Sequence, residues 1–298
     1  MDVLRTSRLV SEGLQPKELV GRGSDSGLVR IRHGAYAKAL ADDPEGRHRQ
    51  LIAATWPLLG GQAVLSHGSA ALLHGLPVWN SLLEQVGTTR PVGGHGRRGR
   101  NLHVRLAELA DSEVTEVDGF ACTSLERTAI DMARLVSYER AVAVLDAAVR
   151  LGADPEMLGE IAARAKGRRG AGTASRALEF ADGRAESVGE SISRVRIVQV
   201  GLPVPDLQFN VFDRNGIWVA RSDFCWREKN VVGEFDGRVK YRGGAEEVAT
   251  AVMREKAREQ AIRDAGWWVV RWDWSDLADG NALRRRIETA FRRSTGQP

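Results

Sequence analysis

The chain has 298 residues, of which 43% are hydrophobic and 28% are charged, a composition typical of a soluble globular protein with two or three domains. No run of 18 apolar residues occurs, and the opening stretch MDVLRTSRLVSEG lacks the apolar core of a signal peptide, so we expect neither export nor a membrane span. The two cysteines, Cys122 and Cys225, lie far apart in the sequence. They indicate neither a disulfide framework nor a zinc site and favour a reducing cytoplasm.

The positive charge is clustered. The formal net charge is only +4, but basic runs occur as RRGR, KGRR and RRR, at 97–100, 166–169 and 284–286. Such runs are suited to contact phosphates, although a solvated protein face explains most of them. Charge alone therefore leaves nucleic-acid binding open.

The first 40 residues predict a small DNA-binding module. Two short helical segments, LRTSRLVSEGL and QPKELV, precede LVRIRHGAYA, in which apolar and basic residues alternate as in a half-buried hairpin. Helix, turn, helix and basic wing is the order of winged-helix DNA-binding modules. This stretch resembles the N-terminal module of AbiEi-type antitoxins, which implies DNA binding and a cognate toxin protein as partner. A dimerisation or docking module is the alternative. The predicted DNA contacts are Lys17, Arg22, Arg30 and Arg32.

Residues 41–180 alternate helical and strand-like segments and predict an α/β middle domain. Thr123 and Glu126 form a T-x-x-E capping box that begins a helix. His67 and His74 lie two helical turns apart, but no third ligand shares their spacing, so we interpret them as packing or capping residues. The stretches SHGSAALLHGLP and DGFACTSLERTAIDMAR resemble the second domain of the same antitoxin-like family, which implies organisation but no chemistry.

From residue 186 onward the sequence predicts a helix, three antiparallel strands, a helix, a strand and a helix. The turn sequences DRNG and REKN separate the three strands. On the third strand, alternation places Glu234 and Asp236 on one face and Val231, Gly233 and Phe235 on the other. The cluster of tryptophans near these strands is assigned to packing rather than to base stacking.

Asp223, on the neighbouring strand, can lie across from Glu234 and Asp236. Three carboxylates brought together repel one another and lose hydration, and a divalent cation removes that cost. All six histidines lie in the first 103 residues, and oxygen ligands alone suit Mg²⁺ or Mn²⁺ rather than zinc. The sequence therefore predicts a metal site at Asp223, Glu234 and Asp236 that would assist phosphodiester hydrolysis.

The segments SVGES, LQFN, RSDFCW, VVGEFDG and REKAREQAIRDAGWWVVRW, in this order, resemble PD-(D/E)XK endonuclease-like domains related to the very-short-patch repair endonuclease. The resemblance covers residues 186–275. It implies active-site roles for the residues at the family's motif positions, which are Glu190, Gln208, Asp223, Glu234, Asp236 and Gly237. From the residues alone, a glutamate at a helix start and a glutamine on a strand are better explained as structural, and the resemblance makes the two explanations about equal.

Two positions depart from the superfamily pattern. The lysine usually found two residues after the glutamate is Asp236 here, and many relatives have a histidine where this chain has Lys240. We therefore assign Lys240 as the cation that stabilises phosphoryl charge, with Lys256 on the following helix as the alternative. Arg263 and Arg271 are expected to line the same basic face and to contact DNA.

The predicted fold class is α/β (α+β), with a winged-helix-like module at 1–40, a middle domain at 41–180 and an endonuclease-like domain with a mixed sheet at 186–298. The predicted function is DNA binding with Mg²⁺-dependent or Mn²⁺-dependent hydrolysis of DNA. The alternative is an antitoxin or transcriptional regulator that uses the nuclease fold for docking. The retained acids favour the enzyme, because docking has no need of mutually repelling carboxylates, whereas the missing motif lysine favours the regulator.

Overall fold

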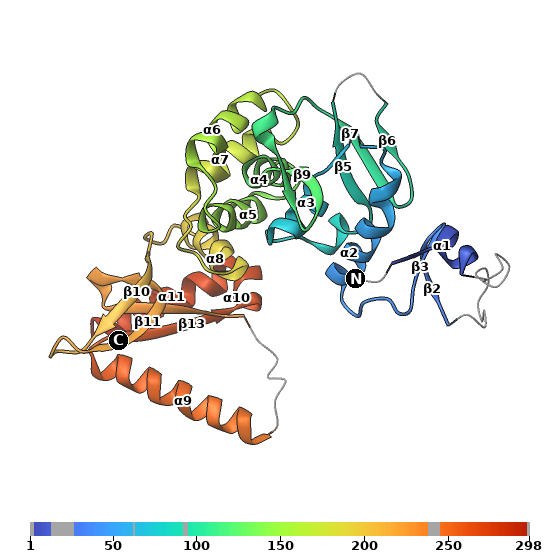
Figure 1. Ribbon diagram of the computed structural model, residues 1–298. Coiled ribbons are helices and arrows are strands. Elements are labelled where there is room, and N and C mark those ends of the chain that lie inside the picture. Colours follow the sequence, from blue (N-terminus) through green and yellow to red (C-terminus); the bar gives the residue numbers. More distant parts are fainter. Residues whose placement is uncertain (1–2, 13–26, 62, 92–94, 238–244, 297–298) are drawn as a thin grey trace. The chain divides into compact units, whose positions relative to one another are not determined.

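The computed structural model describes residues 3–12, 27–61, 63–91, 95–237 and 245–296 (Figure 1). The chain divides into two compact units. Unit 1 contains Met1–Leu135 and Ala153–Gly172, and unit 2 contains Val136–Gly152 and Thr173–Pro298. Both units combine helices with mixed or antiparallel sheets, which confirms the α/β class. The three-part division expected from the sequence stays a prediction.

Unit 1 begins with a small three-stranded sheet in the order β1-β3-β2, beside one short helix. Its elements are β1 (Leu4–Arg5), α1 (Thr6–Ser11), β2 (Val29–Arg32) and β3 (Ala35–Ala37). Leu9 from the helix and Tyr36 from the sheet form its buried core. The first predicted helix and the hairpin are thus confirmed. The second predicted helix lies outside the described residues, as do Lys17 and Arg22.

A six-stranded mixed sheet forms the larger part of unit 1, in the order β6-β7-β5-β4-β9-β8. Its strands are β4 (Val64–Leu65), β5 (Val86–Arg90), β6 (Arg97–Arg98), β7 (Leu102–Leu106), β8 (Val114–Val117) and β9 (Phe120–Thr123). The α-helices of this part are α2 (Pro44–Thr55), α3 (His67–His74), α4 (Leu125–Ala133) and α6 (Pro155–Arg164), and the 3₁₀ helices are Trp56–Leu58, Asn80–Leu82 and Asp111–Glu113. Ile52, Leu65 and Val86 are among the fully buried core residues.

The helix α4 begins at a different cap from the one predicted. Ser124 is the N-cap, and its Oγ accepts a hydrogen bond of 3.2 Å from the backbone N–H of Arg127. Thr123 ends the buried strand β9, and its hydroxyl lies 2.6 Å from that of Thr128. The helix was predicted correctly but the Thr123–Glu126 capping box was wrong, because strand pairing continues through Thr123 and moves the cap by one residue.

Both predicted packing histidines form hydrogen bonds within the protein. Nε2 of His74 lies 2.8 Å from the backbone oxygen of Thr123, and Nδ1 of His67 lies 2.9 Å from Ser66 Oγ. Among the described residues, no group of three or more His, Cys, Asp or Glu side chains is arranged to hold a metal ion.

Unit 2 is built on a four-stranded sheet in the order β10-β11-β12-β13, whose first three strands are antiparallel and whose last pair is parallel. The strands are β10 (Asp206–Phe212), β11 (Trp218–Trp226), β12 (Val231–Asp236) and β13 (Trp268–Asp273). The helices are α5 (Tyr138–Arg150), most of α7 (Ala171–Phe180), α8 (Val188–Gln199), α9 (Ala245–Asp264), α10 (Trp274–Ala278) and α11 (Gly280–Ser294), with a 3₁₀ turn at Arg227–Lys229. The element order predicted from residue 186 onward is confirmed, except that the short helix α10 precedes α11. None of the helices in the described part of the chain is long and apolar enough to span a membrane.

A buried carboxylate connects helix α5 to helix α8 within unit 2. Asp146 is fully buried, and its Oδ2 accepts a hydrogen bond of 2.7 Å from the guanidinium of Arg194 on α8. Its Oδ1 accepts a second bond of 2.7 Å from the backbone N–H of Asp182. A buried charge without such partners would strongly destabilise the fold, so this pairing ties α5 to α8.

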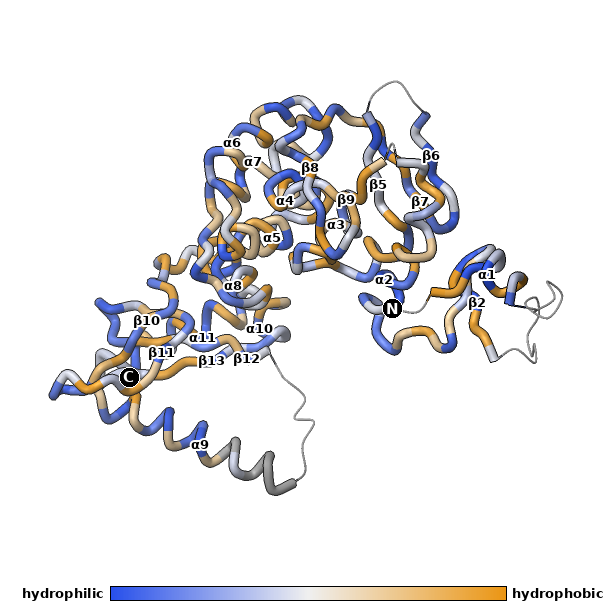
Figure 2. The backbone as a smooth tube through the Cα atoms, viewed as in Figure 1, coloured by the Kyte–Doolittle hydropathy of each residue, from blue (hydrophilic) through white to orange (hydrophobic). Residues whose placement is uncertain are grey.

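The sheet of unit 2 is covered on both faces, by α8, α10 and α11 on one and by α9 on the other (Figure 1). Val231, Phe224 and Trp272 pack on the first face, and Val232 and Ile262 on the second. Because the neighbouring residues Val231 and Val232 face opposite sides of the sheet, the predicted alternation along β12 is confirmed. Hydrophilic and more apolar residues alternate along α9, as expected for a helix with one face on a sheet (Figure 2).

Packing explains only part of the tryptophan cluster. Trp226 and Trp272 are buried, and the Trp272 ring lies 5.0 Å from the ring of Phe224. Trp218 and Trp274 are instead 57% and 45% exposed. The packing assignment is confirmed for the first pair, and also for Trp274, whose ring lies 5.0 Å from that of Phe235. It is wrong for Trp218, which lies at the surface end of β11 and donates a hydrogen bond of 3.0 Å to Asn210 Oδ1.

Gly233 is required by the close approach of Trp272. A Cβ at position 233 would lie 2.6 and 2.7 Å from two carbons of that indole. We therefore expect Gly233→Ala to destabilise the protein by about 1–3 kcal/mol through overpacking, measured by denaturant unfolding. The matched control is Gly159→Ala in α6, where a Cβ would meet nothing within 4 Å and which should be neutral or stabilising. Equal stability of Gly233→Ala and the wild type would contradict the packing described.

Candidate active site

A row of polar side chains crosses the four strands of unit 2. From the register of the neighbouring pairs, Gln208 on β10 lies opposite Asp223 on β11, and Asp223 lies opposite Glu234 on β12. Glu234 pairs directly with Arg271 on β13. Oδ2 of Asp223 also accepts a hydrogen bond of 2.9 Å from the backbone N–H of Phe235. The predicted acids Asp223 and Glu234 are thus held side by side on adjacent strands.

Glu190 joins this row from the first turn of α8. Its helix is capped by Ser187, whose Oγ accepts a bond of 3.1 Å from the N–H of Glu190. Glu190 is only 8% exposed, and its Oε2 accepts hydrogen bonds from Gln208 Nε2 at 2.8 Å and from the backbone N–H of Glu186 at 2.9 Å. The structure therefore connects the two residues for which the sequence also allowed separate structural explanations.

Gln208 adopts an unusual backbone conformation for this position. Its φ angle is +51°, in the left-handed region that glycine favours, within an otherwise extended strand. Such a conformation costs free energy and concentrates at functional sites, where the surrounding structure imposes it. Here the hydrogen bond to Glu190 is the contact that holds the Gln208 side chain.

Asp223 is short of positive charge. Burial, and to a lesser extent the nearby carboxylates of Glu190 and Glu234, raise the pKa of its carboxyl to about 6. The hydrogen bond from Phe235 and the guanidinium of Arg258 lower this pKa without offsetting burial. An additional cation nearby would stabilise the ionised form of such a carboxylate.

Glu234 is in the opposite condition. Its Oε2 accepts a hydrogen bond of 2.9 Å from Arg271, and its Oε1 lies 2.7 Å from a guanidinium nitrogen of Arg258. The Arg258 contact is an ion pair without hydrogen-bond geometry, since this buried Oε1 has no hydrogen-bond partner among the described residues. The expected repulsion between carboxylates thus acts on Asp223. For Glu234 the expectation is wrong, because helix α9 and strand β13 supply two positive charges.

Of the remaining predicted residues in the described part of the chain, only Arg271 is shown to contact this row. Asp236 is exposed at the end of β12, and Lys240 is outside the described residues. Lys256 is exposed on α9. Arg263 pairs with Glu259 at 2.5 Å, and Arg271 forms ion pairs with Glu255 and Glu259 besides Glu234.

Arg258 is a further residue of the site that the sequence pattern does not identify. This residue lies on α9, contacts Glu234, and donates a hydrogen bond of 2.7 Å to the backbone oxygen of Arg221 on β11. The only sequence signal for it is the Arg-rich helix in which it occurs. The sequence does not reveal which of several basic residues on that helix faces the strands.

The donor set fits a hard divalent ion at Asp223 and Glu234. Mg²⁺ is commonly held by one or two protein carboxylates, with water and substrate phosphates completing its shell, so a third protein ligand is not required. The raised pKa of Asp223 marks the position where such an ion would relieve a shortage of positive charge. Glu234 would share its carboxylate between the ion and the two arginines.

Comparison with known proteins identifies the family of this chain. The chain is 33% identical over 252 residues to the uncharacterized proteins Rv2248 and MT2308 of two Mycobacterium tuberculosis strains, a match that covers 83% of this chain and 85% of each relative. The chain belongs to their family. No family model matches it. The crystal structure of the RV2827C protein from the same species matches 59% of this chain and 71% of its own, at 18% identity and a TM-score of 0.37. The chemistry of the site therefore rests on its geometry.

The raised pKa of Asp223 predicts a pH-dependent stability. Its carboxyl holds a proton to higher pH in the folded chain than in the unfolded chain, so its stabilisation is complete below about pH 4 and is lost as the pH rises through about 6. Asp223→Asn should be roughly 2 kcal/mol more stable than wild type at pH 7 and equal to it near pH 4. Denaturant unfolding in EDTA measures this difference.

Glu228→Gln is the matched control for this measurement, because Glu228 is an exposed carboxylate in the same unit. Its stability should follow that of the wild type at every pH. A constant difference between Asp223→Asn and wild type from pH 4 to 7 would contradict the shifted pKa.

Proposed function

We propose that this protein binds DNA and hydrolyses its phosphodiester bonds, with Mg²⁺ or Mn²⁺ held by Asp223 and Glu234 in unit 2. The observation that carries the proposal is the convergence of Glu190, Asp223 and Glu234, with burial and the neighbouring acids raising the pKa of Asp223 to about 6. An isolated structural ion pair would not need this charge-deficient carboxylate. The resemblance to very-short-patch-repair-like endonuclease domains supports the same assignment.

Each residue of the row has a distinct role in this proposal. Asp223 and Glu234 hold the ion, which when bound would polarise a phosphoryl oxygen and lower the pKa of a water molecule. Glu190 orients Gln208 through their 2.8 Å hydrogen bond. Gln208 in turn is placed to position substrate or water beside Asp223.

Arg258 is the described residue best suited to supply the positive charge that the superfamily lysine usually provides. Its guanidinium lies 2.7 Å from Glu234 and is one-third exposed, so it can also meet a phosphate group. Lys256 is exposed on the same helix. Lys240 stays a prediction, since it falls outside the described part of the chain.

DNA cleavage tests this proposal. The purified protein with Mn²⁺ should nick plasmid or cut branched or mismatched duplexes. Asp223→Asn should abolish cleavage, because it removes an ion ligand, while DNA affinity stays equal or rises slightly as a negative charge is lost. Glu228→Gln removes the same charge at an exposed position of unit 2 and should cleave like the wild type. Equal cleavage by wild type and Asp223→Asn, or none with either ion, would refute the hydrolase.

A specific observation also favours the non-catalytic alternative. Glu234 is already neutralised within the protein by Arg258 and Arg271, and Arg271 engages two further carboxylates on α9. A site with its charges satisfied in this way can serve as a stable docking surface. In this alternative the protein is an antitoxin or transcriptional regulator, with a cognate toxin as its partner, and it binds DNA without cleaving it.

The wing of unit 1 is the proposed DNA-contacting surface, and its two arginines are not equivalent. Arg30 is exposed, and its guanidinium lies 2.8 Å from Nδ1 of His33. Arg32 instead donates a hydrogen bond of 2.9 Å to Thr55 Oγ1 on α2, and burial lowers its pKa. Arg30 is therefore the better placed of the two to meet a phosphate.

Salt dependence of DNA affinity distinguishes the two arginines. Each phosphate contact contributes about 0.9 to the slope of log affinity against log salt concentration. Arg30→Gln should reduce this slope by about 0.9, whereas Arg32→Gln should change it much less. Fluorescence anisotropy with a labelled duplex over a salt series measures both. An unchanged slope in Arg30→Gln would mean that the wing does not contact DNA.

A further inference from the structure

Unit 1 contains an arginine-lined cavity that is separate from the row of acids in unit 2. Its volume is about 380 Å³, and its lining includes His67, Thr89, Arg105, Arg134 and Arg168. A neighbouring cavity of about 530 Å³ shares Arg134 and Arg168 with it, so the two adjoin. Together they offer more room than a single inorganic anion needs.

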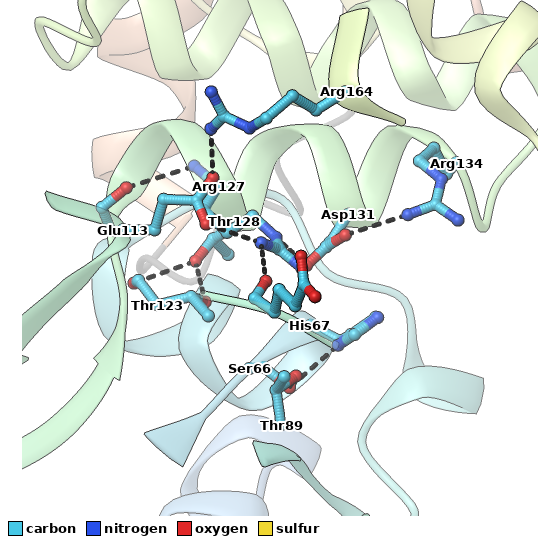
Figure 3. Close-up of polar contacts among 12 residues, drawn as sticks. Ser66, His67, Thr89, Glu113, Thr123, Arg127, Thr128, Asp131, Arg134 and Arg164 are labelled. Atoms are coloured by element: carbon cyan, nitrogen blue, oxygen red, sulfur yellow. Dashed lines mark hydrogen bonds and ion pairs between the residues drawn. The ribbon is translucent and has the colours of Figure 1, made fainter. Parts of the chain in front are cut away.

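One wall of this cavity is a buried ion network on α4 (Figure 3). Arg127 donates hydrogen bonds of 2.8 Å to both Glu113 and Asp131, and Arg134 donates one of 3.2 Å to the other oxygen of Asp131. Glu113 and Asp131 are each about 3% exposed. Both carboxylates are therefore already hydrogen-bonded to arginines, and Asp131 also acts electrostatically on Arg105 across the cavity.

Two other arginines of the lining have no such partner. The side chains of Arg105 on β7 and Arg168 beyond the end of α6 form no hydrogen bond or ion pair with any described residue. Arg105 is partly buried, and burial lowers the pKa of its guanidinium. The lining of the cavity includes four arginines but only two carboxylates, those of Glu108 and Asp131, so it has an excess of positive charge that an anion would compensate.

A buried histidine adds a directed hydrogen-bond donor. His67 is only 8% exposed, and its φ of +54° is strained for a residue other than glycine. Thr89 Oγ1 donates to Ser66 Oγ at 2.8 Å, which leaves the Ser66 proton for Nδ1 of His67 at 2.9 Å. The proton of His67 then lies on Nε2, which has no partner among the described residues (Figure 3).

We propose that this cavity binds a phosphorylated small molecule. Arg105, Arg134 and Arg168 would contact the phosphate, and Nε2 of His67 would donate a hydrogen bond to it. Guanidinium groups suit phosphate oxygens because of their planar, paired donors. A concave site with a buried histidine favours a small ligand over a nucleic-acid backbone, and the adjoining 530 Å³ can accept the rest of the molecule.

Calorimetry with defined probes tests the ligand class. The full chain should bind AMP and pyrophosphate saturably at one site, and should not bind adenosine, which lacks the phosphate. Heats that are absent for both anions, or equal for AMP and adenosine, would overturn the proposal. Duplex DNA binding that is lost in the cavity variants, without binding of either small anion, would also overturn it and assign these arginines to DNA.

Three variants locate the site. Arg168→Gln changes an exposed residue and should leave the fold intact, and Arg105→Gln removes the partly buried guanidinium. Each should weaken AMP or pyrophosphate binding about tenfold or more, since each removes a charged hydrogen-bond donor. Arg97→Gln, on β6 of the same unit but outside the cavity, removes the same charge and should bind like the wild type. Equal losses in all three variants would show a general charge effect and refute the site.

Discussion

The cost of burying charge is the constraint on which both units depend. A carboxylate or guanidinium removed from water destabilises the fold by several kcal/mol unless it is paired. In unit 1, Arg127 is held between Glu113 and Asp131, so α4 is fixed beside the segment before β8. In unit 2, Asp146 and Arg194 tie α5 to α8.

At both candidate sites this pairing is incomplete, and the two sites have opposite signs. Burial and neighbouring acids raise the pKa of Asp223, whereas burial lowers the pKa of Arg105. Each lies near a residue other than glycine with a strained backbone, Gln208 in one case and His67 in the other. Uncompensated charge beside imposed strain is costly, and such positions are concentrated at functional sites.

Within unit 2, the strand register brings residues that are far apart in the sequence side by side. Two antiparallel pairings and one parallel pairing place Gln208, Asp223, Glu234 and Arg271 in a row. The same arrangement serves either of the proposed functions. In an enzyme, the arginines that neutralise Glu234 in the absence of substrate would give up this carboxylate to a metal ion. In a docking surface, they would stay paired with it.

The sequence by itself determined the order of the four strands of unit 2, the alternation along β12 and the closeness of Asp223 to Glu234, because these follow from a two-residue strand period and short turns. Only the tertiary structure decided that Arg258 contacts Glu234, that α5 belongs with α8, that Ser124 caps α4, and that Arg105 and His67 line one cavity. These contacts join segments far apart in the chain or depend on which helix face meets a sheet. Local periodicity carries no information about contacts between segments that are far apart in the chain, whereas the need to pair buried charges favours some of these contacts over others.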